Sequence, residues 1–254
     1  MASVTYVQAP IQGQTGSKIH DPNFREVYEV ARQQSENGDP QAIERWYDEI
    51  GSTFFPSLPS GCTCAARHAV KLLTEGLAET SKPLRVLDAG CCTGGMGKLL
   101  RQHAPTWHLV GSDISHVCLK QASLVFDQVV QSQLPELSLS DADFDVVICV
   151  GTICWGHAPP SSVSSLARVL KPGGIMITGH HINDYERSGW GLPEAYQALK
   201  QMTLISKERG PYYKDGDPND DTGIFMIYRK KEPRALDRPA GCVMHVLQKV
   251  CPCI

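Results

Sequence analysis

Short apolar runs recur along the chain from residue 84 onward and alternate with segments of helical spacing. The runs are dense in Val, Ile and Leu, as expected of strands in a parallel sheet that helices cover on both faces. We therefore predict an α/β fold with a mostly parallel sheet. The expected strands are residues 84–87, 108–111, 126–130, 146–150 and 175–178, and the expected helices between them lie near 96–103, 115–124 and 161–170.

Outside this region the pattern predicts further helices and a second pair of strands. Asp-Pro pairs at 21–22 and 39–40 are typical of helix starts, because Asp caps the first turn and Pro fits the first helical position. A turn is expected at residues 171–174 (Lys-Pro-Gly-Gly), where Pro stops the preceding helix. Further expected elements are helices at 64–77 and 193–202, strands at 203–207 and 223–229, and an acidic loop at 214–222.

These elements suggest a division of the chain into four parts. Residues 1–20 show no periodicity and are expected to form a flexible leader, followed by a helical lid over residues 21–80. Residues 81–231 form the predicted core, and residues 232–254 are a tail.

Composition and charge narrow the possible partners. The formal net charge is −3 and the isoelectric point is about 6.3, which argues against a general nucleic-acid binder because neutralising phosphates requires excess Lys and Arg. We find no stretch approaching the roughly 20 apolar residues of a membrane span and no secretory signal, so we expect a cytoplasmic protein. Its ten cysteines are then expected to be thiols.

A glycine turn follows the first strand and opens a helix, a context that indicates nucleotide binding. Gly90 and Gly94 allow the backbone to turn tightly, and Asp113 ends the next strand, where a carboxylate can accept hydrogen bonds from both ribose hydroxyls. A dinucleotide fingerprint would require Gly at position 92, where this chain has Cys92. Asp88 at the start of the turn also disfavours a pyrophosphate and favours a cationic ligand.

The order of four motifs resembles that of the class I S-adenosylmethionine-dependent methyltransferases. The motifs are Asp-x-Gly-x-x-Thr-Gly from Asp88, Asp113 after the second strand, Phe-Asp-Val-Val at 144–147 and Leu-Lys-Pro-Gly-Gly at 170–174. The resemblance covers residues 42–231 and implies a Rossmann-like, seven-stranded, mostly parallel sheet with helices on both faces and an N-terminal helical lid. Within the class, Val-Gly-Thr at 150–152 and Gly-His at 156–157 are most similar to the group around methyltransferase-like protein 27.

The resemblance also implies roles for individual residues. Asp88, Gly90 and Gly94 would shape the site for the methionine part of S-adenosylmethionine, Asp113 would hold the ribose, and Ile114 would stack on the adenine. Tyr47 resembles the tyrosine of a lid helix, although it can equally be a packing aromatic. The complete predicted cofactor-binding set is Tyr47, Asp88, Gly90, Cys92, Thr93, Gly94, Asp113, Ile114, Gln133, Leu134 and Gly151.

Two positions depart from the family pattern. Cys92 replaces the glycine common in the middle of the turn, so a thiol is expected at or beside the cofactor. Gln133 and Leu134 stand where an acidic residue often binds the adenine amino group, so backbone groups would have to recognise the base.

The loop after the fourth strand is expected to line the acceptor side, because ligands bind outside the carboxyl ends of parallel strands. His157 is the candidate general base, since His titrates near neutral pH; a structural His is the alternative. His180 and His181 are expected to face the same region. They do not predict a metal site, because adjacent strand residues point to opposite faces. A segment from Asp184 to Trp190 is a candidate acceptor lid, or else an ordinary loop.

Cysteines outside the core leave two further alternatives open. Pairs at 62/64, 91/92 and 251/253 permit an arsenite- or thiol-methylating site, although none has the Cys-x-x-Cys spacing of a strong metal site. Cys251 stands fourth from the end, the frame of a prenylation signal, but Pro252 and Cys253 fit that signal poorly. A docked C-terminal helix is the plainer interpretation.

The sequence thus predicts an enzyme that transfers a methyl group from S-adenosylmethionine to an oxygen, nitrogen or carbon of a small molecule. Two alternatives remain: an enzyme of the same fold that uses the bound cofactor in a cyclisation or pericyclic step, and a non-catalytic interaction module. The acceptor and the oligomeric state are not predicted.

Overall fold

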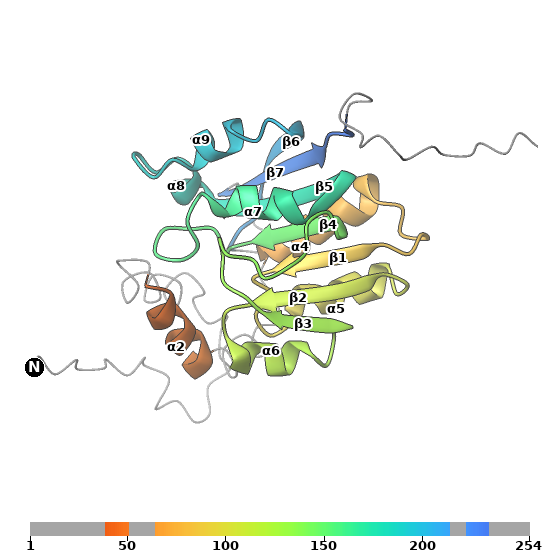
Figure 1. Ribbon diagram of the computed structural model, residues 1–254, viewed down its shortest axis with the longest axis horizontal. Helices are drawn as coiled ribbons and strands as arrows, with labels where there is room; N and C mark the ends of the chain where they lie inside the picture. The colour runs from red at the N-terminus through yellow and green to blue at the C-terminus, as the bar shows by residue number, and fades with distance from the viewer. Residues whose placement is uncertain (1–38, 51–63, 214–221, 234–254) are drawn as a thin grey trace, which may run out of the picture.

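A single seven-stranded sheet organises the chain. The computed structural model describes residues 39–50, 64–213 and 222–233 (Figure 1). The strands lie in the order β3-β2-β1-β4-β5-β7-β6; the four pairings among strands β1 to β5 are parallel, and β7 runs antiparallel between β5 and β6. Their bounds are β1 Arg85–Ala89, β2 His108–Asp113, β3 Gln128–Gln131, β4 Phe144–Val150, β5 Leu170–His181, β6 Met202–Gly210 and β7 Gly223–Lys230. The predicted mostly parallel, seven-stranded sheet is confirmed.

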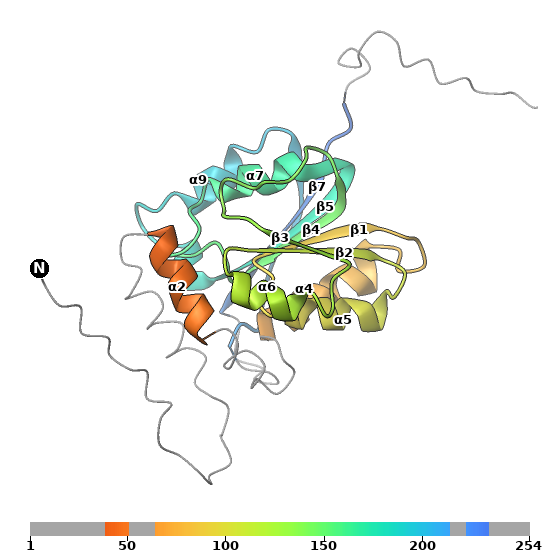
Figure 2. The same cartoon turned by 60° about the horizontal axis from the view of Figure 1, so that its bottom comes forward.

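Helices cover both faces of this sheet (Figure 2). One face packs against α4 (Cys64–Leu72), α5 (Gly95–His103) and α6 (His116–Ala122). The other face packs against α7 (Ser162–Val169), α8 (Ile182–Tyr185) and α9 (Leu192–Gln197). Consecutive residues of β1 illustrate the arrangement, because Val86 belongs to the first core cluster and Leu87 to the second. A strand buried on both faces must be apolar throughout, and this explains the runs seen in the sequence.

Helix α2 (Pro40–Ile50) lies apart from these layers, beyond the ends of the central strands (Figure 1). Its start at Pro40 confirms the second Asp-Pro prediction, and the Asp39 side chain accepts a hydrogen bond from the Gln41 backbone N–H as a capping residue does. The predicted lid also included α4, but α4 is part of the core, since Ala65, Ala69 and Leu73 are at most 1% exposed.

Several predicted boundaries are wrong. Residues 171–174 form no reversal but a bulge within β5, where Phe144 pairs with Leu170 and Val146 pairs with Ile175. Within the bulge Gly173 has φ +77°, a left-handed conformation that glycine adopts without strain. The helix expected at 64–77 ends in a π-helical turn, η1 (Leu73–Leu77), and α8 was not predicted. The helix at 21–22, the loop at 214–221, Cys62 and the C-terminal cysteines lie outside the described residues.

Candidate functional site

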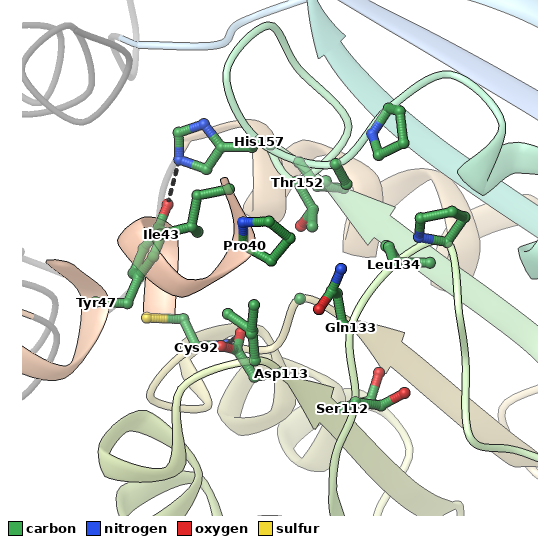
Figure 3. A pocket seen from close by; sticks show the side chains of 18 of the residues that line it. Pro40, Ile43, Tyr47, Cys92, Ser112, Asp113, Gln133, Leu134, Thr152 and His157 are labelled. Atoms are coloured by element: carbon green, nitrogen blue, oxygen red, sulfur yellow. Dashed lines mark hydrogen bonds between the residues drawn. The ribbon is translucent and has the colours of Figure 1, made fainter. Parts of the chain in front are cut away.

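A pocket of about 330 Å³ opens where β1, β2 and β4 end, and α2 closes one side of it (Figure 3). Its wall comes from seven separate stretches of the chain. The lining residues are Pro40, Ile43, Trp46, Tyr47, Ala65, Gly90, Cys92, Ser112, Asp113, Ile114, Ser132, Gln133, Leu134, Pro135, Glu136, Val150, Gly151, Thr152, His157, Ala158, Pro159 and Tyr212. This is the position at which parallel α/β sheets bind ligands.

The glycine turn between β1 and α5 forms one wall of the pocket. A Cβ at Gly90 would stand 2.0 Å from Thr152 Oγ1, and Gly90 has φ +84°. Close approach of the protein's own β4 loop therefore requires glycine here, in addition to any approach by a ligand. Cys92 has φ +46°, a left-handed conformation that L-residues adopt at a cost of about 1–2 kcal/mol. Cys92 thus adopts a backbone conformation that favours glycine.

Asp113 at the end of β2 connects the turn to the next helix. Its Oδ2 accepts a hydrogen bond of 2.8 Å from the Cys92 backbone N–H, and its Oδ1 accepts one of 2.9 Å from the Ser115 backbone N–H. Burial raises the pKa of Asp113, although these backbone donors oppose the rise. Each carboxylate oxygen has a second lone pair, so Asp113 can still accept hydrogen bonds from a ligand in the pocket.

Asp88 lies behind the turn and does not line the pocket. Only 1% of its surface is exposed, and neither carboxylate oxygen has a hydrogen-bond partner among the described residues. Burial, with a smaller contribution from the charge of Asp113, raises the pKa of Asp88 to about 8. A buried carboxyl group without a hydrogen-bond partner is rare and costly, so Asp88 is the exceptional polar group of the turn.

Two side chains hold α2 over the pocket. The Tyr47 hydroxyl lies 3.1 Å from Nε2 of His157, which follows β4 (Figure 3). Asp48, the next residue, accepts hydrogen bonds from the Ser115 hydroxyl and the Val117 backbone N–H at the start of α6. Burial raises the pKa of Tyr47 well above its usual value, so this phenol remains protonated. Either the Tyr47 hydroxyl or the His157 ring donates this hydrogen bond, according to the tautomer of His157.

Asp48 also belongs to the one group of potential metal-ligating side chains found in the described part of the chain. The group comprises Glu44, Asp48 and His116. Its members already contact protein groups: His116 Nδ1 lies 3.0 Å from Asp48 Oδ2, and Gln131 Nε2 donates to Glu44 Oε1. These contacts explain why the three side chains lie together: they attach α2 to α6 and to the end of β3.

His180 does not face the pocket, contrary to the sequence prediction. It points to the opposite face of β5, where Nδ1 lies 3.0 Å from the Ile153 carbonyl oxygen and Nε2 lies 2.7 Å from the Tyr196 hydroxyl. The same hydroxyl is hydrogen-bonded to Thr178 Oγ1. Burial lowers the pKa of His180 to about 4, so the ring is neutral near pH 7. This network fixes the start of the loop that carries His157.

The candidate acceptor lid is instead packed protein. Asp184 and Tyr185 of α8 are 0% and 8% exposed, and Asp184 Oδ1 accepts a hydrogen bond from the Trp155 backbone N–H. Trp155 packs edge-on against Trp190 and lies beneath the guanidinium of Arg187. This segment therefore supports the β4 loop from behind and does not cover the pocket.

Most of the predicted site residues meet in the pocket, but three do not. Nine of them line it: Tyr47, Gly90, Cys92, Asp113, Ile114, Gln133, Leu134, Gly151 and His157. Asp88, Thr93 and Gly94 lie outside the lining; Gly94 instead packs against Ala122, whose Cα would be 3.2 Å from an added Cβ. The sequence analysis missed Tyr212 after β6, whose hydroxyl approaches Gly151, because no motif marks it.

Comparison with known protein sequences finds methyltransferases. Residues 87–178 match the family model of a methyltransferase domain. The chain is 32% identical over 120 residues to a malonyl-[acyl-carrier protein] O-methyltransferase of Enterobacter lignolyticus, covering 46% of this chain and 45% of that protein. It is 23% identical over 177 residues to the rat thiol S-methyltransferase TMT1B, covering 63% and 67%. The chain spans about half or less of the length of the curated relatives that it matches at 32% identity.

Solved structures confirm the fold. A chain in the complex of the Haloferax volcanii Trm112 methyltransferase activator with a methyltransferase superposes with a TM-score of 0.52 at 14% identity, covering 80% of this chain and 98% of that chain. An S-adenosylmethionine-dependent methyltransferase of Mesorhizobium loti superposes with a TM-score of 0.50 at 13% identity, covering 65% and 100%. The chain therefore has the class I methyltransferase fold. Within the described residues, no helix is long and apolar enough to cross a membrane.

Proposed function

We propose that this chain is an S-adenosylmethionine-dependent methyltransferase that acts on a small molecule. The observation that carries the proposal is the pocket itself, which joins the glycine turn, Asp113 and His157 in one cavity. The matching methyltransferase domain spans the same turn and strands. The resemblance to the group around methyltransferase-like protein 27 rests on the motif after β4 and is part of the proposal.

The residues present fit S-adenosylmethionine, a cationic nucleoside without phosphate. Gly90 places no side chain in the pocket, and the buried carboxyl group of Asp88 lies behind the same turn. Asp113 would hold the ribose, and Ile114, Gln133 and Leu134 would surround the adenine. When bound, S-adenosylmethionine supplies an electrophilic methyl group. The residues of the chain then have to orient the acceptor and, for some nucleophiles, remove a proton.

We assign the acceptance of that proton to His157. Its Nε2 lies 3.1 Å from the Tyr47 hydroxyl in the space beside α2. An acceptor with a hydroxyl or amine group would have to replace Tyr47 as the partner of Nε2 and donate its proton there. The neutral His180 network behind the loop keeps His157 at this position.

The test is methyl transfer by the purified full chain. We expect release of S-adenosylhomocysteine and a labelled product from a metabolite extract supplied with labelled S-adenosylmethionine. His157→Gln should lower kcat about 10²-fold while leaving the cofactor Kd within about twofold, since general bases contribute roughly 10²–10⁴-fold. His108→Gln is the matched control, because His108 begins β2 and lies outside the pocket lining.

The outcomes separate the alternatives. Cofactor binding without transfer to any component of the extract would contradict the methyltransferase proposal and favour the interaction module. Formation of a product without conversion of S-adenosylmethionine to S-adenosylhomocysteine would favour the enzyme that uses the bound cofactor in a cyclisation or pericyclic step. Failure to bind S-adenosylmethionine or S-adenosylhomocysteine would contradict the assignment of the pocket.

A further inference from the structure

Two thiols meet at the pocket wall. Cys92 in the glycine turn and Cys118 in α6 place their sulfur atoms 3.6 Å apart, although 26 positions separate them in sequence. Both are free thiols in this structure. A disulfide requires an S–S separation of about 2.05 Å, so the two sulfurs need to approach by about 1.5 Å to bond.

The two thiols differ in access. Cys92 is half-buried and lines the pocket, with its sulfur visible on the wall below Tyr47 (Figure 3). Cys118 is fully buried at 0% exposure, and its sulfur lies 3.7 Å from the Tyr47 carbonyl oxygen. A small reagent that enters the pocket therefore reaches Cys92 first, and Cys118 is the neighbour that can complete a bond.

From this geometry we infer that Cys92 and Cys118 form an oxidative modification site, which a small peroxide converts to an intramolecular disulfide. In the first step the Cys92 sulfur attacks hydrogen peroxide: an S–O bond forms, the O–O bond breaks, and water leaves with the thiol proton. In the second step the Cys118 sulfur displaces water from this sulfenic acid, forming the S–S bond. Two thiols are oxidised and one peroxide is reduced to two waters.

The cross-link would deform the pocket. The Cys92 backbone N–H donates to Asp113 Oδ2, and Ser115 caps α6 by accepting from the Cys118 backbone N–H. A bond between the two sulfurs therefore moves the glycine turn relative to the Asp113 carboxylate, which lines the pocket beside it. We expect the oxidised protein to bind a nucleoside cofactor at least about tenfold more weakly than the reduced protein, a loss of about 1.4 kcal/mol.

The surroundings make this reaction slow at neutral pH. Burial, contact with Cys118 and the nearby Asp113 carboxylate raise the pKa of Cys92 well above its usual value. The reactive thiolate is therefore scarce, and the rate of cross-linking should rise about tenfold for each pH unit below that pKa.

The experiment treats the purified full chain with hydrogen peroxide, alkylates the remaining thiols under denaturing conditions and maps peptides without reduction. We expect a cross-link between the peptide of residues 86–98 and that of residues 102–120, formed faster at pH 9 than at pH 7 and reversed by dithiothreitol. Cys92→Ala should abolish it. Cys91→Ala is the matched control that should retain it, because the adjacent Cys91 sulfur points to Gly111 instead.

Cys118→Ala supplies a second measurement that does not depend on the cross-link. This variant should keep the cofactor affinity of the reduced wild type and should accumulate a sulfenic acid at Cys92, detected by a dimedone adduct. Oxidation of Cys92 without a cross-link in the wild type, or a cross-link that leaves cofactor affinity unchanged, would overturn the inference. The cross-link itself forms whether or not the chain transfers methyl groups, so its failure is distinct from failure of the proposed function.

Discussion

Asp88 and His180 are buried to the same extent and titrate abnormally for the same reason, yet the protein treats them differently. Each is 1% exposed, and burial drives each toward its neutral form, with a pKa of about 8 for Asp88 and about 4 for His180. Both ring nitrogens of His180 have hydrogen-bond partners, whereas neither oxygen of Asp88 has one in the described part of the chain.

This contrast distinguishes a buried polar group with hydrogen-bond partners from one without them. A perturbed pKa alone would mark both residues as functional candidates. The partners decide: His180 completes a closed network with Thr178 and Tyr196, whereas Asp88 is buried behind the glycine turn without a hydrogen-bond partner among the described residues. The region around β4 and β5 is thus fully hydrogen-bonded at His180. The region around β1 and β2 contains Asp88, whose burial without a partner destabilises the unliganded fold.

The largest expected effect concerns the pH dependence of stability. The folded protein holds the Asp88 proton up to pH about 8, whereas the unfolded chain releases it near pH 4, so this residue lowers the free energy of unfolding as pH rises between these values. The slope is about 1.4 kcal/mol per pH unit. Asp88→Asn should therefore gain stability over wild type progressively from pH 4 to pH 8, measured by urea unfolding. A constant difference across this range would contradict the contrast.

Gly90 connects these two regions, because the glycine turn after β1 contacts Thr152 of the loop after β4. Gly90→Ala combines a left-handed φ with a steric clash, and we expect a loss of about 2–4 kcal/mol in the free energy of unfolding. Gly76→Ala is the control: no described heavy atom lies within 4 Å of its added Cβ, so its stability should be unchanged or slightly higher. Equal effects of the two substitutions would show that the close approach at Gly90 is unimportant.

Asp113→Ala tests the region around β1 and β2, where Asp113 lines the pocket. Loss of the carboxylate leaves ribose hydroxyls and the Cys92 backbone N–H without their acceptor, so the cofactor Kd should rise by the equivalent of about 1–3 kcal/mol. Calorimetric titration with S-adenosylhomocysteine measures this change. An unchanged Kd would refute the role of Asp113.

Tyr196→Phe tests the region around β4 and β5. We expect it to have the smallest effect on stability and cofactor binding. It removes the hydroxyl that pairs with Thr178 and His180, and should cost about 1–2 kcal/mol of stability. The cofactor Kd should stay within about twofold of wild type, because Tyr196 lies outside the pocket lining. A parallel fall in cofactor affinity would make this network part of the binding site.

The sequence by itself determined the sheet, the glycine turn and the position of Asp113. Each depends on a pattern within a dozen or so residues: an apolar run long enough for a buried strand, glycines that permit a turn, or a carboxylate directly after a strand. The sequence did not determine where every element ends, because the bulge at 171–174 and the π-helical turn at the end of α4 depend on pairing and packing with other segments.

Only the tertiary structure decided which side chains meet. Tyr47 contacts His157 across 110 positions, Tyr212 joins the pocket without any motif, and Cys92 lies against Cys118. The sequence analysis expected His180 to face the pocket, but alternation along β5 turns its ring to the opposite face of the sheet. There the ring contacts Tyr196, and burial lowers its pKa so that it is neutral. Local propensity acts over neighbouring residues, whereas pKa values, partners and cavities follow from how distant segments pack together.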